Sequence, residues 1–235
     1  MPDLPDWVRP VAEYMFKEGV KHTLEIAAVS VALSAVIGVV LGTLLTVRWL
    51  PLRALIRGYI EIWRGLPIIV TIFLMFFALP TLADETNIEA LRLSALNAAI
   101  VGLSLWGSAQ VAEATRGAVQ SIPREQHEAA AALGFGWVGR HVHVVLPQAS
   151  RRLLPPLVGL LVGIIQNSTL AQVIGVPEIL ETGKREYERL QQPPPFGAGN
   201  PHAFEIYGAV LVFFFVISFP LTRLAAYLER RLVDV

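Results

Sequence analysis

The sequence contains no cysteine among its 235 residues. Disulfide bonds, thiol nucleophiles and cysteine-ligated metal sites are therefore excluded. Charged residues are also scarce, at 16% of the chain against about 25% in an average soluble domain. The formal net charge is zero, so the composition provides no excess of basic residues for a nucleic-acid partner.

Signature motifs of common catalytic sites are missing as well. The sequence has no G-x-x-x-x-G-K-[ST] loop to hold ATP phosphates, no H-E-x-x-H zinc motif and no G-x-S-x-G nucleophile turn. His141 and His143 are two positions apart, which is not the i, i+4 spacing of a helical metal pair. We therefore expect neither an enzyme nor a chain that binds a cofactor or metal itself.

Long apolar runs dominate what is present. Hydrophobic residues make up 54% of the chain, and the mean hydropathy is +0.55. A bilayer core of roughly 30 Å requires about 20 helical residues. The sequence predicts an all-α membrane protein, with one transmembrane domain over residues 1–235. The predicted spans are residues 26–47, 59–82, 93–111, 156–174 and 206–227.

The arginines predict how these spans are oriented. Cytoplasmic segments of membrane proteins carry an excess of Lys and Arg. Three segments are basic here, through Arg48, Arg53 and Arg57, then Arg116, Arg124, Arg140, Arg151 and Arg152, and finally Arg223, Arg230 and Arg231. The intervening segments are acidic or balanced. We therefore expect the segment 112–152 and the C-terminus in the cytoplasm, and the N-terminus outside.

The stretch GFGWVG, from Gly134 to Gly139, spells the G-x-G-x-x-G fingerprint of a dinucleotide-binding loop. That fingerprint requires a preceding strand and an acidic residue about 20 positions further on. The preceding residues are EQHEAAAAL, in which alanine and leucine strongly favour a helix. The context therefore argues against a nucleotide site.

A helix, a glycine break and a second helix explain this stretch better. Gly134 stands where a helix C-cap requires the left-handed conformation. A second short helix is expected from about Trp137 to Val145, and Pro147 should end it. Such a unit presents an amphipathic face to a groove on a partner. An ordinary amphipathic connector between two spans is equally compatible with the pattern.

The residues EAAAALGFGWVGRHVHVVLP resemble the EAA loop in the membrane subunits of bacterial ABC importers. The family pattern is matched without a gap by Glu128, Ala129, Ala130, Gly134, Val144, Leu146 and Pro147. In that family the loop, here residues 121–150, contains the coupling helix that docks on a cytoplasmic ATPase. The resemblance implies this docking role for Glu128, Ala129, Gly134, Trp137, Arg140 and Val144.

The resemblance extends to the polar amino-acid uptake branch of the family, the histidine, glutamate and glutamine type. Glu61, Arg64, Gly65 and Pro67 supply its E-x-x-R-G-x-P motif, and STLAQVIGVPEIL is similar to its fourth span. It implies a type I importer in a bacterial cytoplasmic (inner) membrane. It also implies two ATPases that carry ATP and Mg²⁺, a second permease, identical or different, and an extracytoplasmic solute-binding protein.

Polar residues interrupt the fourth predicted span at Gln166, Asn167, Ser168 and Thr169. Four consecutive residues cover every face of a helix, so they must face protein or water, or break the helix. These four residues either form hydrogen bonds between helices or line a translocation path for a polar solute. Gln110 and Trp106 in the third span are further candidates for lining such a path. Many relatives read Lys-Asp-Thr-Ser-Leu here, so the absence of both charges argues against a cationic solute.

The alternative function is an ion-coupled carrier or channel that works without an ATPase. It would require charged or ion-coordinating residues at mid-membrane. The mid-span polar residues are amides and hydroxyls, which argues against proton coupling. The sequence therefore favours the permease subunit of an ATP-driven importer for polar amino acids or close analogues.

Overall fold

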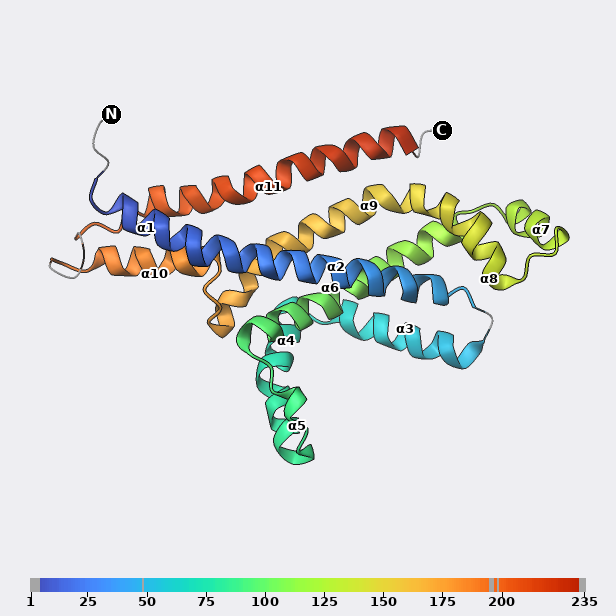
Figure 1. Cartoon of the computed structure of the whole chain (residues 1–235), viewed down its shortest axis with the longest axis horizontal. Coiled ribbons are helices and arrows are strands. Elements are labelled where there is room, and N and C mark those ends of the chain that lie inside the picture. The colour runs from blue at the N-terminus through green and yellow to red at the C-terminus, as the bar shows by residue number, and fades with distance from the viewer. Residues whose placement is uncertain (1–4, 48, 195–196, 198, 233–235) are drawn as a thin grey trace. The chain divides into compact units, whose positions relative to one another are not determined.

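The computed structural model describes residues 5–47, 49–194, 197 and 199–232, and every described element is a helix (Figure 1). The chain divides into two compact units. Unit 1 comprises Met1–Val29, Ile68–Leu103 and Ile165–Phe219, and unit 2 comprises Ser30–Pro67, Ser104–Ile164 and Pro220–Val235. The long helices α2 (Lys21–Leu44), α6 (Ala95–Gln120), α9 (Leu146–Asn167) and α11 (Ala203–Leu232) each contribute a segment to both units.

Unit 1 also contains shorter helices from three regions of the sequence. They are α1 (Val8–Tyr14), the π-helical turn η1 (Met15–Val20), α4 (Ile68–Phe73), the π-helical turn η2 (Leu74–Ala78), α5 (Leu79–Thr86), the 3₁₀ turn η3 (Glu89–Leu91), the 3₁₀ segment η5 (Ser168–Ile174) and α10 (Ile179–Gln191). Their core consists of buried aliphatic side chains from α1, η1, α10 and α11, namely Val11, Met15, Ile179, Leu190, Ile206 and Val210.

Close backbone approach joins α10 to η1 in this unit. The backbone N–H of Ile179 donates to Thr23 Oγ1 at 3.0 Å. A Cβ atom on Gly19 would overlap Thr182 Oγ1 and lie 2.9 Å from Ile179 Cα, so a side chain there would separate the two elements. Glycine at this position therefore allows α10 to pack directly on η1.

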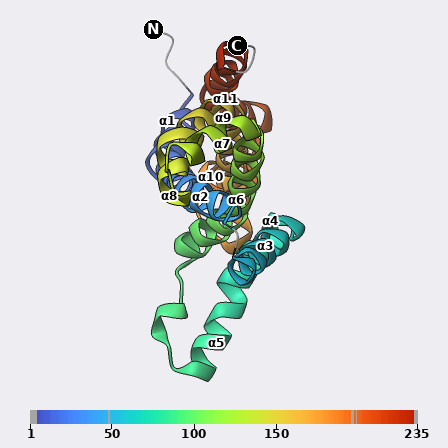
Figure 2. The same cartoon turned by 90° about the vertical axis from the view of Figure 1, so that its right-hand side faces the viewer.

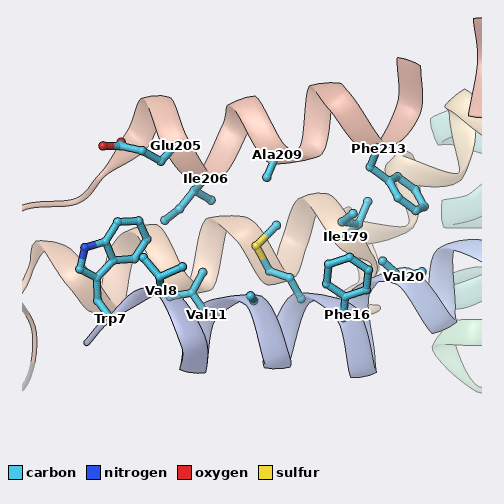
Figure 3. A pocket seen from close by; sticks show the side chains of 12 residues that line it. Trp7, Val8, Val11, Phe16, Val20, Ile179, Glu205, Ile206, Ala209 and Phe213 are labelled. Atoms are coloured by element: carbon cyan, nitrogen blue, oxygen red, sulfur yellow. The ribbon is translucent and has the colours of Figure 1, made fainter. Parts of the chain in front are cut away.

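An apolar cavity of about 360 Å³ lies among α1, η1, the start of α10 and α11 (Figure 3). Val11, Ile206 and Phe213 are among the side chains that line it, whereas the Glu205 carboxylate points away from the apolar side chains. These walls offer little to a polar solute, since an amino acid requires paired polar groups when it leaves water. We therefore do not place the solute site there.

Unit 2 contains α3 (Leu50–Gly65), α7 (Arg124–Ala132), α8 (Trp137–Arg140) and the π-helical turn η4 (His141–Val145). Within the unit, α7 and α8 lie beyond the end of α6 (Figures 1 and 2). One buried cluster joins α3 to α2 and α6, and its members are Leu45, Ile56, Ile60 and Ala112. A second joins α6 to η4 and α9 through Ala118, Val119, Ile122, Val145, Ala149 and Leu153.

In the part of the chain that the structure describes, five helical stretches are long and apolar enough to cross a membrane, which confirms the all-α membrane class. They are Val8–Leu44, Ile68–Thr86, Ala95–Gln120, Trp137–Ile174 and Ala203–Leu232, and we refer to them as the candidate spans. The predicted span 59–82 is interrupted in the structure between Gly65 and Ile68. Leu66 is extended there because the proline that follows it disfavours the helical conformation.

One expectation about the coupling segment is wrong. Pro147 does not end the helix, because η4 runs directly into α9, which continues to Asn167. Pro147 lies in the first turn of α9, where the missing N–H is tolerated, and the π-helical turn before it loosens the bonding pattern. Helix therefore continues without a break from α8 through η4 and α9 within the fourth candidate span.

Candidate coupling segment and solute pathway

The glycine break between α7 and α8 has the geometry of a helix C-cap. Gly134 has φ +83°, in the left-handed region. The Phe135 N–H donates to Ala130 O at 3.1 Å, and the Gly134 N–H donates to Ala131 O at 3.0 Å. These two bonds form a Schellman motif, which satisfies the last carbonyls of α7. The expected helix and left-handed glycine are confirmed, and a dinucleotide loop, which must follow a strand, does not fit.

His141 connects α8 to the end of α2. Its Nδ1–H donates to Trp137 O at 2.8 Å, and its Nε2 lies 3.0 Å from Thr46 Oγ1. The Trp137 ring stacks on the imidazole with centroids 4.1 Å apart, and His127 packs edge-on at 6.3 Å. Burial lowers the pKa of His127, and the Arg140 guanidinium acts in the same direction. Sequence reasoning missed the contact with Thr46 because the two partners are 95 positions apart.

Three aliphatic side chains of the segment are exposed. Leu133 is 79% exposed and Val138 is 65% exposed, and Val142 is exposed as well. The three residues lie within ten consecutive positions, and exposed apolar side chains that form one patch are typical of a docking surface. These residues were not among those predicted to dock, although three aliphatic side chains around a glycine break are a signal that could have indicated them.

The residues expected to dock lie around this surface. Glu128 and Ala129 are exposed on α7, and Glu128 accepts from Arg124 Nε at 2.8 Å. Trp137, Arg140 and Val144 are half-buried. Trp137 Nε1 and Arg140 Nε are buried donor atoms without a hydrogen-bond partner among the described residues.

The polar cluster in the fourth candidate span breaks the α-helix. α9 ends at Asn167, and the chain continues as the 3₁₀ segment η5 from Ser168. Ser168 is fully buried and donates to Ile165 O at 2.7 Å, while Thr169 donates to Gln166 O at 2.9 Å. Gln166 Nε2 also donates to Ser218 Oγ on α11 at 3.4 Å, which is an interhelical bond of the kind the sequence left open.

A second polar cluster lies on α6 in unit 2. Gln110 Oε1 accepts from Arg64 Nε at 3.3 Å. Both residues line a pocket of about 410 Å³ together with Glu113. Trp106, the other expected pathway residue on this helix, is half-buried. Gln110 and Trp106 belong to unit 2, whereas residues 166–169 belong to unit 1.

Nothing in the described part of the chain resembles a metal centre. Within residues 5–47, 49–194, 197 and 199–232 there is no group of three or more acidic or histidine side chains that could hold a metal ion. The polar clusters instead consist of amides, hydroxyls and arginine–carboxylate pairs. Such groups orient a polar solute by hydrogen bonding.

Residues 34–234 match the family described as the binding-protein-dependent transport system inner membrane component. The chain is 36% identical to the glutamine transport system permease protein GlnP of Escherichia coli (strain K12), over 92% of this chain and 91% of that protein. It is 30% identical to the probable glutamine ABC transporter permease protein GlnM of Bacillus subtilis (strain 168), over 93% of both chains. In fold it resembles an amino acid ABC transporter crystallised with histidines, with a TM-score of 0.78 at 23% identity, over 98% of this chain and all of that one.

The chain therefore belongs to the family of inner-membrane components of binding-protein-dependent transport systems. It is a multi-pass permease subunit of an ABC importer and not an enzyme, since ATP hydrolysis belongs to a separate ATPase subunit. An ATPase and a solute-binding protein are the general partners of such a subunit. The carrier or channel alternative is not supported.

Proposed function

We propose that this permease subunit carries polar amino acids or close analogues across the inner membrane. Support comes from relatives that are named as glutamine permeases at 30% and 36% identity over more than nine-tenths of this chain. The uncharged pair Gln166 and Asn167 favours a neutral solute over a cationic one. The pathway would be formed by Gln166, Asn167, Ser168, Thr169, Gln110 and Trp106.

In this proposal the segment 121–150 transmits the motion of the ATPase. Its docking residues would be Glu128, Ala129, Gly134, Trp137, Arg140 and Val144, to which the structure adds Leu133 and Val138 as an exposed apolar face. That face is the observation that carries the docking proposal, since a partner that covers it removes apolar surface from water. ATP binding shifts the equilibrium between inward and outward states only if the ATPase docks more strongly on one of them.

The assembly we propose consists of two permeases, two ATPases holding ATP and Mg²⁺, and an external binding protein in the lipid bilayer. The excess of arginine in the segment 112–152 and near the C-terminus supports a cytoplasmic location for both, with the N-terminus outside. The membrane domain would cover residues 1–235, with spans near 26–47, 59–82, 93–111, 156–174 and 206–227. The second permease is either an identical chain or a related one.

Gly134→Val tests the coupling role, with Gly136→Val as its matched control. Valine is strained at the φ of +83° of Gly134, by about 1–2 kcal/mol, but it fits the φ of −65° of Gly136, where no atom lies within 4 Å of an added Cβ. We expect Gly134→Val to reduce both ATP-driven L-glutamine uptake and the recovery of ATPase with the tagged chain by about tenfold. Gly136→Val should retain both.

Wild-type behaviour of Gly134→Val would contradict the proposed coupling role. If Gly134→Val cells take up L-glutamine at the wild-type rate and the ATPase still co-purifies in stoichiometric amount, the segment does not couple. A wild-type chain that is recovered folded and alone, and that transports without ATP, would contradict the importer assembly as a whole.

A further inference from the structure

Arg64 is the last arginine of α3, and its guanidinium is only partly used by the protein. Its Nε donates to Gln110 Oε1 at 3.3 Å. Its two terminal nitrogens have no acidic partner within 4 Å among the described residues. Arg57, two turns earlier on the same helix, instead lies 3.8 Å from Glu61. Arg64 is thus held at one nitrogen and leaves a planar pair of donors available.

The Arg64 side chain lines a pocket whose walls include both a positively and a negatively charged residue. Arg64, Gln110 and Glu113 line a space of about 410 Å³, whose other walls are Ala114 on α6 and Pro156, Gly159 and Leu160 on α9. Gln110 and Glu113 are three positions apart, so they lie on one face of α6. The volume falls within the roughly 300–1,000 Å³ of small-molecule sites.

Glu113, which lines the same pocket, retains acceptor capacity. Its carboxylate accepts from Arg116 Nε at 2.9 Å and from a terminal nitrogen of Arg116 at 2.5 Å. A carboxylate has about four lone-pair positions, so about two remain for another donor. The pocket therefore offers paired donors at Arg64 and free acceptor positions at Glu113.

An α-amino acid carries the complementary pair of charges on one carbon atom. We infer that Arg64 binds the α-carboxylate of the carried solute and that Glu113 binds its α-ammonium group. Gln110 is a positioning residue, because it holds Arg64 Nε and so aims the two terminal nitrogens. This inference rests on the proposed function, since it assigns the amino-acid backbone of the solute to a site.

A lipid phosphate would compete for the same guanidinium, since both are oxyanions. The lining disfavours it, because Glu113 would repel a phosphate held at Arg64. An α-carboxylate avoids this cost, because the ammonium group beside it neutralises Glu113. A zwitterion therefore fits the lining better than an anion without an attached cation.

The test is equilibrium binding of radiolabelled L-glutamine to the nucleotide-free importer, purified in detergent with its ATPase and without the binding protein. 4-Aminobutanamide, which is L-glutamine without the α-carboxylate, serves as competitor. We expect Arg64→Gln to weaken L-glutamine binding about tenfold to a hundredfold, because a charge-assisted bidentate contact is lost. The affinity for 4-aminobutanamide should change by less than about threefold. Arg57→Gln, the matched control, should bind both compounds as the wild type does.

Three results would overturn the inference while the proposed function stands. Arg64→Gln could bind L-glutamine with wild-type affinity, or could lose affinity for both compounds equally, which would indicate a collapsed pocket. The effect could also appear only in nanodiscs with anionic lipid, which would identify a lipid phosphate as the partner of Arg64. A wild-type importer that neither binds nor takes up L-glutamine or any other amino acid would refute the inference and the proposed function together.

Discussion

Two helices outside the candidate spans, α10 and α7, differ in how fully their own chain covers them. α10 begins at Glu178, which is fully buried, and its apolar side chains Ile179 and Leu190 belong to the core of unit 1. α7 buries Ala130 but ends beside Leu133, which is 79% exposed. The comparison shows that α10 buries its apolar side chains within the chain, whereas α7 leaves the adjacent Leu133 exposed.

The first turns of the two helices show the same contrast. Glu178 accepts hydrogen bonds from the backbone N–H groups of Leu180 at 2.9 Å and Glu181 at 2.8 Å, so α10 is capped by its own side chain. α7 begins after Pro123, which provides no side-chain cap. Among its first N–H groups, that of Gln126 donates to Pro123 O at 3.1 Å, whereas no side chain at Pro123 caps this end of the helix.

The largest effect should come from separating α10 from η1. Gly19→Leu places a side chain against Ile179 Cα and Thr182 Oγ1, and overpacking of this kind costs about 3 kcal/mol or more. Gly208→Leu on α11 is the control, because no atom lies within 4 Å of a Cβ there. The unfolding temperature of the purified importer should fall strongly for Gly19→Leu and change little for Gly208→Leu. An equal fall for both variants would mean that α10 is not tightly packed against η1.

A smaller effect should follow from pH at the start of α10. Burial raises the pKa of Glu178 from 4.5 to about 7, against the backbone hydrogen bonds that lower it. A carboxyl group whose pKa is raised by folding stabilises the fold fully below about pH 4.5. Part of that stability is lost as the pH rises to about 7, and the expected loss is about 2–3 kcal/mol.

Glu178→Gln is the matched variant for this measurement, since the amide keeps the shape and does not titrate. The unfolding temperature of the wild type should fall relative to that of Glu178→Gln between pH 4.5 and pH 7.5. Parallel curves for the two proteins over this range would show that Glu178 titrates normally and is not buried as described.

The smallest effect on folding should come from the open surface beside α7. Leu133→Ser removes an exposed side chain, so the free energy of unfolding should change by less than about 0.5 kcal/mol. Recovery of the ATPase with the tagged chain should nevertheless fall severalfold. Leu55→Ser on α3, where leucine is 73% exposed, should leave the recovery unchanged. Equal recovery from both variants would mean that Leu133 does not dock.

Local features of the sequence predicted the local features of the structure. The apolar runs predicted membrane helices, and the alanine-rich stretch before Gly134 predicted a helix with a left-handed glycine after it. Both follow from neighbouring residues, because propensity and capping act over a single helical turn. The prediction that Pro147 ends the helix was also based on neighbouring residues alone, and it was wrong. Proline usually ends a helix, but the π-helical turn η4 before it changes the bonding pattern that makes proline disruptive.

Contacts between distant residues could not be predicted in this way. Thr46 meets His141 across 95 positions, and Thr23 meets the Ile179 backbone across 156. Hydroxyl, imidazole and amide groups pair with many partners, so residue type alone does not select among them. The pocket of Arg64, Gln110 and Glu113 is a further example, because the sequence singled out Arg64 and Gln110 but did not indicate that they meet or that Glu113 joins them.

The sequence by itself therefore determined the membrane class, the helical segments and the break at Gly134, because hydropathy and backbone conformation are properties of short stretches. The tertiary structure decided which polar groups are paired, which apolar side chains stay exposed and which charged residues line the same pocket. Those outcomes depend on which helices pack together, and packing is settled by contacts between residues far apart in the chain.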